Sequence, residues 1–341
     1  MFDAVCTIGP ASNAAPVLQM LRLVTSRFRL NTGHIDPEAL RELLKRLAEL
    51  AHPSESGAAL SVTLDLQGAK VRIGSFPYEH LTAGPVELHF GWEFRDPRVI
   101  PVPFACIFEQ TAPGDELLLN DGRVRLRIQS QPEAHTLRAE CVQPGKLSTS
   151  KGLNRPSCPY RLSTVSLRDQ ESIRIGLEFP FVDFAVSFVT SKSEAAIYRP
   201  LTGSRRLIAK IERLPALQAL SELDQAYDEL WLCRGDLGTE VEPYRLGELQ
   251  AGFARELKRL RKPCLLAGEV LGSMLYQPVP TRSEMVHLYD ALQAGFFGIV
   301  LSDETAVGPH ALQVVEFLRQ FQAAYKLENG EKPNWQEMSA R

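Results

Sequence analysis

The sequence lacks the features that mark several broad classes of protein. Its apolar runs stay well below the roughly 18 residues that cross a bilayer, so we expect no membrane span. Lys and Arg total 38 against 41 Asp and Glu, and the net charge of −3 gives no overall basic field that would attract nucleic acid. The first residues carry no charged segment followed by an apolar one, and we therefore expect no secretory signal.

Cysteine is scarce and scattered. The six cysteines include no CxxC pair, so we expect neither a disulfide framework nor a zinc site. Reduced thiols of this kind are typical of a cytosolic protein, and we predict a cytoplasmic location. Hydrophobic residues at 44% and charged residues at 23% are an ordinary globular balance. The 341 residues are enough for one large domain and an insert.

Short apolar runs alternate with amphipathic segments along most of the chain. Most of the apolar runs are continuous, as expected for strands of a parallel sheet that is buried on both faces. The predicted strands are 3–9, 26–31, 60–66, 182–189, 206–212, 229–236, 263–269 and 298–304. Eight strand–helix repeats favour an α/β fold of the (β/α)₈ TIM-barrel type, with a doubly wound open sheet as the alternative.

Helical patterns separate the predicted strands. Asp36 can cap a helix that begins at Pro37. Segments 191–194 and 281–284 have the spacing of a capping box. A further long helix is predicted over 243–261.

One stretch, from 67 to 154, shows no convincing helix. Short alternating segments and turn residues dominate it, and Asn120-Asp121-Gly122 is a strong hairpin signal. We predict a small all-β lid domain inserted after the third strand. The barrel would then consist of 1–66 and 155–328, followed by a polar tail at 329–341.

Polar residues stand at the ends of the predicted strands, where barrels of this type carry their chemistry. Arg29 and Asn31 point the same way because strand side chains alternate, and so do Lys210 and Glu212. Glu212 and Asp236 end consecutive strands, and two such carboxylates suit Mg²⁺ or Mn²⁺, although each could instead pair with a nearby cation. With Lys210 and Arg29 beside them, a metal–phosphate or metal–carboxylate site is the favoured interpretation.

Two further features have plainer alternatives. The backbone amides at Gly235 and Asp236 could hold a carboxylate or phosphate at the start of a short helix, but the GDLG segment could simply be a turn. His34 could contact a ligand, but a lone histidine is usually a partly exposed polar residue.

Ten segments of the chain resemble the pyruvate kinase family and occur in the family's order. They are CTIGPAS, FRLNTGHI, LDLQGAKVRIG, NDGRV, SKGLNRP, VDFAVSFV, IAKIE, CRGDLGTEV, GSMLYQPVPTRSE and LSDETAVG. Together they cover nearly the whole chain. The resemblance implies a barrel with a lid after the third strand. It also implies Mg²⁺-dependent phosphoryl transfer between phosphoenolpyruvate and ADP, giving pyruvate and ATP.

The resemblance also implies roles for individual residues. Glu212 and Asp236 would bind the divalent metal, Mg²⁺ or Mn²⁺. The residues expected in catalysis are Lys210, Arg29, Arg72 and Ser302. Those expected to bind substrate are Gly235, Asp236 and Ser187, and those expected to bind nucleotide are Asn31, His34, Lys151 and Lys70.

The chain departs from the family at several positions. Gly33 and Leu66 replace residues that would supply oxygen ligands for K⁺. Lys70 replaces a glutamate, and relatives with lysine there do not need K⁺, so we predict that K⁺ is not required. Gly268 replaces a threonine implicated in protonating the enolate and is expected to leave a vacant space. Asp303 adds a carboxylate near the barrel mouth.

The pattern stops shortly after the eighth helix, so we expect the family's C-terminal regulatory domain to be absent. A homodimer through barrel helices, or a monomer, is then expected in place of a tetramer.

Three functions remain open at this point. The favoured one is a pyruvate kinase-like phosphotransferase, supported by Lys210, Glu212 and Asp236. The second is a metal-dependent lyase or aldolase-like enzyme that works through a pyruvate enolate and admits a second substrate beside Gly268. The third is a non-catalytic relative that binds a metabolite and regulates a partner.

Overall fold

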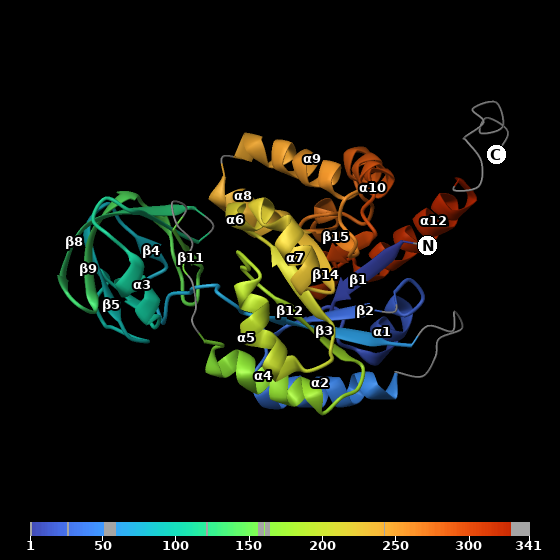
Figure 1. Ribbon diagram of the computed structural model, residues 1–341, viewed down its shortest axis with the longest axis horizontal. Helices are drawn as coiled ribbons and strands as arrows, with labels where there is room; N and C mark the ends of the chain where they lie inside the picture. The colour runs from blue at the N-terminus through green and yellow to red at the C-terminus, as the bar shows by residue number, and fades with distance from the viewer. Residues whose placement is uncertain are drawn as a thin grey trace.

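The computed structural model describes residues 2–25, 27–50, 59–120, 122–155, 160, 164–241 and 243–328. Within them, a barrel of parallel strands surrounded by helices lies beside a separate β domain (Figure 1). No helix among these residues is long and apolar enough to cross a bilayer. The five cysteines that the description includes are free thiols. Cys158, Asp121 and the predicted tail at 329–341 lie outside the described residues.

Eight parallel strands close the barrel in the order β1-β16-β15-β14-β13-β12-β3-β2. Their bounds are β1 (Asp3–Thr7), β2 (Arg27–Asn31), β3 (Ser61–Leu66), β12 (Val182–Val186), β13 (Leu207–Ile211), β14 (Glu229–Cys233), β15 (Cys264–Ala267) and β16 (Gly298–Leu301). Each strand lies within a predicted one. Closure of the ring confirms the (β/α)₈ barrel and excludes the open sheet.

Helices follow the strands and cover the outside of the barrel (Figure 1). The α-helices are α1 (Ala15–Leu21), α2 (Pro37–Glu49), α4 (Leu167–Leu177), α5 (Ser193–Thr202), α6 (Leu214–Gln218), α7 (Leu220–Ala226), α8 (Arg234–Glu240), α9 (Leu246–Glu256), α10 (Arg282–Ala294), α11 (Asp303–Ala306) and α12 (Ala311–Glu328). Three short 3₁₀ turns, η1 (Thr32–His34), η2 (Pro243–Arg245) and η3 (Gly272–Leu275), complete the series within the described residues.

Two of the three predicted helix starts have the expected caps. The Asp36 carboxylate accepts hydrogen bonds from the first amides of α2, at 3.1 and 3.0 Å. Thr281 and Glu284 form a complete capping box at α10. The capping box predicted at 191–194 is only half formed. The Glu194 carboxylate accepts the Ser191 amide at 3.1 Å, but the N-cap residue of α5 is Lys192, whose side chain makes no capping bond.

The predicted helix over 243–261 is also too long. A 3₁₀ turn begins it, and α9 ends at Glu256. The amides of Arg261 and Lys262 both donate to the Asp224 carboxylate at 2.9 Å. These bonds direct the chain away from the helix axis and toward β15.

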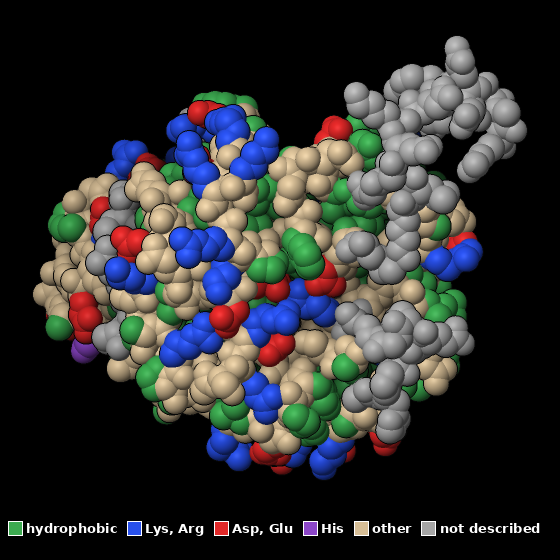
Figure 2. All heavy atoms as spheres, turned by 45° about the vertical axis from the view of Figure 1, so that its right-hand side comes forward, with side chains coloured by type: hydrophobic (Ala, Val, Ile, Leu, Met, Phe, Trp, Pro, Cys, Tyr) green, Lys and Arg blue, Asp and Glu red, His purple; other side chains and the backbone are tan. Residues whose placement is uncertain are grey.

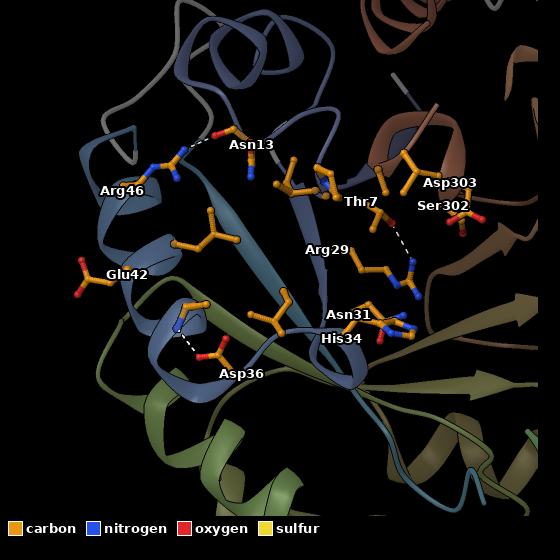
Figure 3. Close-up of a pocket in the computed structure, with 18 residues that line it drawn as sticks. Thr7, Asn13, Arg29, Asn31, His34, Asp36, Glu42, Arg46, Ser302 and Asp303 are labelled. Carbon is orange, nitrogen blue, oxygen red and sulfur yellow. Dashed lines mark hydrogen bonds between the residues drawn. The ribbon is translucent and has the colours of Figure 1, made fainter. Parts of the chain in front are cut away.

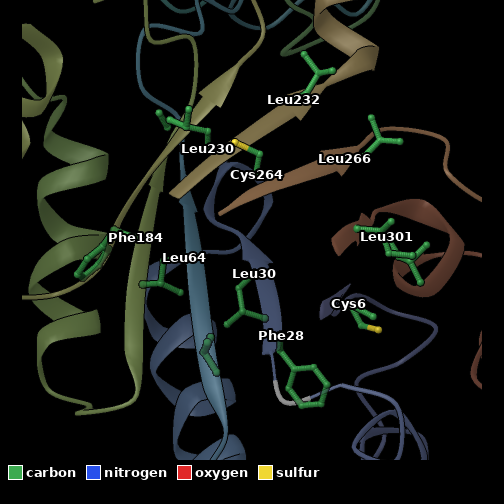
Figure 4. Close-up of a cluster of buried hydrophobic side chains, with 14 of the residues drawn as sticks. Cys6, Phe28, Leu30, Leu64, Phe184, Leu230, Leu232, Cys264, Leu266 and Leu301 are labelled. Atoms are coloured by element: carbon green, nitrogen blue, oxygen red, sulfur yellow. The ribbon is translucent and has the colours of Figure 1, made fainter. Parts of the chain in front are cut away.

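Apolar side chains on the outer face of the strands form the main core, beneath the helices. Leu30, Leu64 and Phe184 belong to this cluster, with Leu232 and Leu266 from later strands (Figure 4). The inner face holds a smaller apolar cluster built around the fully buried Trp231. Charged and polar side chains lie above and below that inner cluster, because the side chains of each strand alternate between the two faces.

The β domain lies between β3 and α4 along the chain. Its elements are β4 (His80–Leu81), β5 (Gly84–Phe90), β6 (Val99–Val102), α3 (Ala105–Gln110), β7 (Glu116–Leu119), β8 (Val124–Glu133), β9 (Thr136–Gln143), β10 (Gly145–Lys146) and β11 (Leu153–Asn154). A six-stranded sheet, β11-β7-β8-β9-β5-β6, encloses an apolar core of its own. The antiparallel pair β7–β8 is the predicted hairpin.

Helix α3 corrects the expectation that this stretch contains no helix. It has six residues, of which Ile107 and Phe108 are buried in the core of the β domain. Six residues are fewer than two turns, too short for a 3.6-residue period to show in the sequence.

Candidate active site

A cluster of charged side chains fills the inner face of the barrel at the carboxyl ends of the strands. We call it the mouth cluster; it consists of Arg29, Asp65, Ser187, Lys210 and Glu212. Asp65, at the end of β3, is at its centre and is 3% exposed. Its carboxylate accepts hydrogen bonds from Arg29 Nε at 2.9 Å, Lys210 Nζ at 3.0 Å and Ser187 Oγ at 3.0 Å.

Lys210 joins the two carboxylates of the cluster. Its ammonium lies 3.0 Å from Asp65 and 2.9 Å from Glu212 Oε1, and it donates to Ser187 Oγ at 2.9 Å. The second oxygen of Glu212 accepts the Phe188 amide at 2.8 Å. Lys210 and Glu212 therefore point into the barrel together, as their spacing along the strand predicts.

The buried charges shift one another's protonation. Burial acts to raise the pKa of Asp65, but Lys210 and Arg29 outweigh it and lower that pKa to about 2. Burial raises the pKa of Glu212, with a further contribution from Asp236, against the opposing charge of Lys210. Burial lowers the pKa of Lys210, but Asp65 and Glu212 raise it above its ordinary value. Lys210 is therefore a fixed positive charge at neutral pH.

Asp236 lies at the edge of the same site, in the first turn of α8 and not at a strand end as predicted. Its carboxylate accepts two hydrogen bonds from Lys70 Nζ, at 2.7 and 2.9 Å. Lys70 belongs to the segment that leads from β3 into the β domain, so this ion pair ties that segment to the barrel. Burial raises the pKa of Asp236, but Lys70 outweighs it and the pKa is lowered.

The ring of Phe188 packs against Lys70. Its ring lies 5.1 Å from Lys70 Nζ and 4.9 Å from the Arg213 guanidinium carbon, both within cation–π range. Its backbone has φ +61°, a conformation rare for a bulky residue. The hydrogen bond from its backbone amide to the Glu212 carboxylate helps to hold this conformation. Arg213 itself is buried and paired with Glu240 at 2.9 Å.

Glu212 and Asp236 fit a divalent metal of the Mg²⁺ type. No group of three or more His, Cys, Asp or Glu that could hold a metal occurs in the part of the chain that is described. Mg²⁺ is commonly held by only one or two carboxylates, with water and substrate oxygens completing its shell. Burial, and after it the charge of Asp236, raises the pKa of Glu212, and each of the two carboxylates is paired with a lysine, Glu212 with Lys210 and Asp236 with Lys70.

A cavity of about 680 Å³ opens from the mouth cluster toward α2. Figure 3 shows Arg29, Asn31 and His34 close together in it, with Ser302 and Asp303 entering from the start of α11. Arg29 also donates to Thr7 Oγ1 at 2.8 Å. The side-chain oxygen of Asn31 already accepts a hydrogen bond from the Gly33 amide, at 3.1 Å. Ser302 directs its amide to Glu304 at 2.7 Å.

A second cavity, of about 640 Å³, lies between the β domain and the barrel. Its lining includes His34 and Arg168 from the barrel, Arg72 from the connecting segment, and Trp92 and Phe104 from the β domain. On the face shown in Figure 2, Lys and Arg side chains gather beside Asp and Glu side chains near the middle of the molecule.

The residues predicted on the nucleotide side come from different elements. Arg72 donates to the Ser150 carbonyl at 2.8 Å, next to Lys151. The Lys151 carbonyl accepts the Ile73 amide at 2.9 Å, which holds the lysine at the edge of the β domain. His34 faces this region across the cavity; partial desolvation lowers its pKa, helped by Arg72 and other cations.

The vacant space expected at Gly268 is not there. Gly268 has φ +87°, and a β-carbon at this position would lie 2.9 Å from the Gly235 amide nitrogen. Its carbonyl oxygen accepts two hydrogen bonds from Arg234, at 2.9 and 2.6 Å. The loop after β15 therefore packs closely against the start of α8. The place that a side chain of Gly268 would take is filled by backbone, and it offers no room for the second substrate of the lyase alternative.

Two residues that hold the mouth cluster together were not predicted as site residues from the sequence. The signal available for Asp65 is its position in the run SVTLDL, which gives it the same parity as the other inward residues. Thr7 links the site to β16, donating to the Leu301 carbonyl at 2.6 Å while accepting from Arg29. A hydroxyl in a short apolar strand gives no signal of such a role.

The sequence is similar to proteins of a known family. A family model described as "Pyruvate kinase, barrel domain" matches residues 2–315. A pyruvate kinase of Agrobacterium vitis is 34% identical over 92% of this chain and 66% of its own length. Pyruvate kinases of Thermotoga maritima and Aeropyrum pernix are 28% and 31% identical, over 92% and 94% of this chain and 68% and 70% of their own lengths. The chain thus spans about two thirds of the length of these relatives.

Proposed function

The chain belongs to the pyruvate kinase family of phosphotransferases, and we propose that it transfers a phosphoryl group between phosphoenolpyruvate and ADP, giving pyruvate and ATP. The observation that carries the proposal is Lys210, whose ammonium is held between Asp65 and Glu212 at 3.0 and 2.9 Å. Phosphoryl transfer needs fixed positive charge around a metaphosphate-like centre, and a charge that is already positioned loses nothing to reorganisation.

In this proposal, Lys210 and Arg29 face the phosphoryl group during transfer. Asp65 holds both cations through the hydrogen bonds given above, so that neither swings away when substrate leaves. Ser187 fixes the ammonium from a third direction. The amides at Gly235 and Asp236 would hold the substrate carboxylate.

Family membership implies a divalent metal. Glu212 and Asp236 would hold Mg²⁺ or Mn²⁺, which supplies positive charge to the oxygens of both substrates when bound. The Lys70 ammonium forms an ion pair with Asp236. Binding of the metal ion would therefore weaken or break this ion pair.

The nucleotide is proposed to enter the cavity beside α2. Asn31 and His34 line this cavity, and His34 also lines the second cavity, together with Arg72 and with Ser150, the neighbour of Lys151. Movement of the β domain over the mouth would exclude water from the transfer. Ser302 would complete the wall near the reacting groups.

The first experiment measures products from phosphoenolpyruvate, ADP and Mg²⁺. Equal amounts of pyruvate and ATP are expected. Pyruvate without ATP would overturn the kinase proposal. A Mg²⁺-dependent rise in melting temperature with phosphoenolpyruvate, but no turnover, would favour a non-catalytic binding protein.

K⁺ independence is part of the proposal. Lys70 puts an ammonium at the site, 2.7 Å from Asp236 and over the Phe188 ring. We expect the rate to be the same in KCl and in tetramethylammonium chloride of equal ionic strength. A rate that rises steeply with KCl alone would contradict this.

A homodimer through barrel helices is proposed on the basis of exposed apolar side chains. Tyr276, Val279 and Val286, before and within α10, are 87%, 63% and 60% exposed. Light scattering at micromolar concentration is expected to show a dimer that Tyr276→Ser weakens. A monomer at all concentrations would refute it.

A further inference from the structure

The segment that joins the barrel to the β domain begins with a tight turn at residues 67–70, directly after β3. The Lys70 amide donates to the Gln67 carbonyl at 3.2 Å, and the Gln67 side-chain amide donates back to the Lys70 carbonyl at 3.0 Å. The turn is therefore closed twice, once through the backbone and once through a side chain. We call these four residues the linker turn.

The linker turn is attached to the barrel through Asp169, in the first turn of α4. One oxygen of its carboxylate accepts the Gln67 amide at 2.9 Å, and the other accepts the Gly68 amide at 2.9 Å. Tyr198 of α5 donates its hydroxyl to the second oxygen at 3.1 Å. The Asp169 side chain is completely buried, so these bonds do not compete with water.

A second contact fixes the position of the same turn. Gly68 has φ +57° and approaches Ser187, the residue after β12, so closely that a β-carbon would lie 2.0 Å from the Ser187 carbonyl oxygen. The Ala69 amide also points to that carbonyl, at 3.4 Å. The turn is thus held between Asp169 and the backbone of a residue in the mouth cluster.

The linker turn ends on Lys70, whose ammonium contacts Asp236. From these contacts we propose that Asp169 is a positioning residue, which places the linker turn so that Lys70 and the β domain are correctly aligned with the barrel mouth. It touches neither substrate nor metal, and acts through Gln67, Gly68 and Lys70. None of the roles implied by the family resemblance includes it.

The test compares two variants that alter the same carboxylate. Asp169→Asn replaces one acceptor by an NH₂ group that faces a backbone N–H, so one bond to the turn is lost. Tyr198→Phe removes the third donor and leaves both bonds to the turn, and is the matched control. For Asp169→Asn, hydrogen exchange at 67–70 is expected to rise about tenfold or more, while β13 is unchanged.

The kinetic readout rests on the proposed function. In Asp169→Asn, kcat with ADP is expected to fall about tenfold, and KM for phosphoenolpyruvate to change less than about twofold, because the barrel residues that bind it remain in place. Tyr198→Phe keeps the kcat of the wild type. Equal losses of melting temperature in both variants, with kcat per folded molecule and exchange at 67–70 unchanged, would show that Asp169 is only a structural residue.

Failure of the proposed function and failure of the inference about Asp169 give different results. If the wild-type protein makes no pyruvate, the proposed function fails, and hydrogen exchange alone decides the role of Asp169. If Asp169→Asn does not fold, exchange in the wild type decides instead. The amides of Gln67 and Gly68 are expected to be strongly protected, and unprotected amides there would overturn the inference.

Discussion

The inner face of the barrel carries buried charge at both ends, and strand β2 contributes an arginine to each. Arg29 belongs to the mouth cluster. Arg27, two residues earlier, points into the opposite end, where it binds Asp3 and, at 3.0 Å, Glu229. Arg206 approaches Glu229 at 3.4 Å. We call Asp3, Arg27, Arg206 and Glu229 the lower cluster.

Burial and ion pairing are alike at the two ends, so neither property identifies the site. Arg27 and Glu229 are 5% and 2% exposed, and Asp65 is 3% exposed. The difference lies in what surrounds the charges. The mouth cluster opens into a cavity and lies beside Asp236 and the segment leading to the β domain.

The mouth also separates the pKa values of its carboxyl groups. The pKa of Asp65 is lowered to about 2, and the pKa of Glu212 is raised. Environments that separate the pKa values of neighbouring groups are typical of reacting sites. We therefore propose that the mouth cluster carries the chemistry and that the lower cluster contributes stability, as in barrels generally.

The largest expected effect is on stability. Arg27→Met leaves the buried Glu229 and the partly buried Asp3 without their main partner, and we expect the free energy of unfolding to fall by about 3–5 kcal/mol. Chemical denaturation measures this loss. The kcat/KM of the molecules that remain folded is expected to stay within about twofold of the wild type. A proportionate loss of activity would break the distinction between the two ends.

The next effect is on activity. Lys210→Met removes the central cation of the mouth cluster, and kcat/KM is expected to fall by about 10²–10³-fold. Lys192→Met, at an exposed lysine that lies 3.9 Å from Glu222, is the control for loss of one positive charge. If kcat/KM of Lys210→Met falls by less than about tenfold, Lys210 takes no part in the reaction.

A smaller effect is expected where the chain departs from its relatives. Gly268→Thr restores the family residue but places a β-carbon 2.9 Å from the Gly235 amide. We expect a loss of about 1–3 kcal/mol in the free energy of unfolding and a higher KM for phosphoenolpyruvate. Gly203→Thr is the matched control, because Gly203 also has positive φ but no neighbour within 4 Å. If the two variants have the same KM, the loop after β15 does not shape the substrate site.

The smallest effect concerns His34 and pH. Its lowered pKa means that the unfolded chain binds the proton more readily than the folded protein does. Stability from His34 is therefore complete above about pH 6.5 and is lost as pH falls below that value. We expect the wild type to lose slightly more melting temperature than His34→Gln between pH 7.5 and pH 5.5, as thermal scans would show. A larger loss of melting temperature in His34→Gln than in the wild type would contradict the expected direction of the pH dependence.

The barrel could be predicted because its information is local. Each inner strand is a short apolar run, and residues two apart, such as Lys210 and Glu212, necessarily share a face. Their meeting with Asp65 follows from closure of the ring. The start of α5 and the end of α9 could not be predicted. The start of α5 depends on the Glu194 carboxylate, which accepts two backbone amides. The end of α9 depends on Asp224, which is distant in sequence.

The sequence did not indicate the linker turn or the packing of Gly268. Asp169 is a charged residue in the first turn of a helix, where helix capping usually explains it. Its true partners, Gln67 and Gly68, lie about a hundred residues earlier in the chain. The expected space at Gly268 came from comparing side chains alone. In the structure the backbone of Arg234 and Gly235 fills that space, which a comparison of side chains cannot reveal.

The most direct test of the account measures ADP-dependent pyruvate formation by three proteins in one assay: the wild type, Arg27→Met and Lys210→Met. Each rate is divided by the folded concentration. The account predicts equal kcat/KM for the wild type and Arg27→Met, and a value about 10²–10³-fold lower for Lys210→Met. Equal losses in the two variants, or no activity in any of the three proteins, would contradict it.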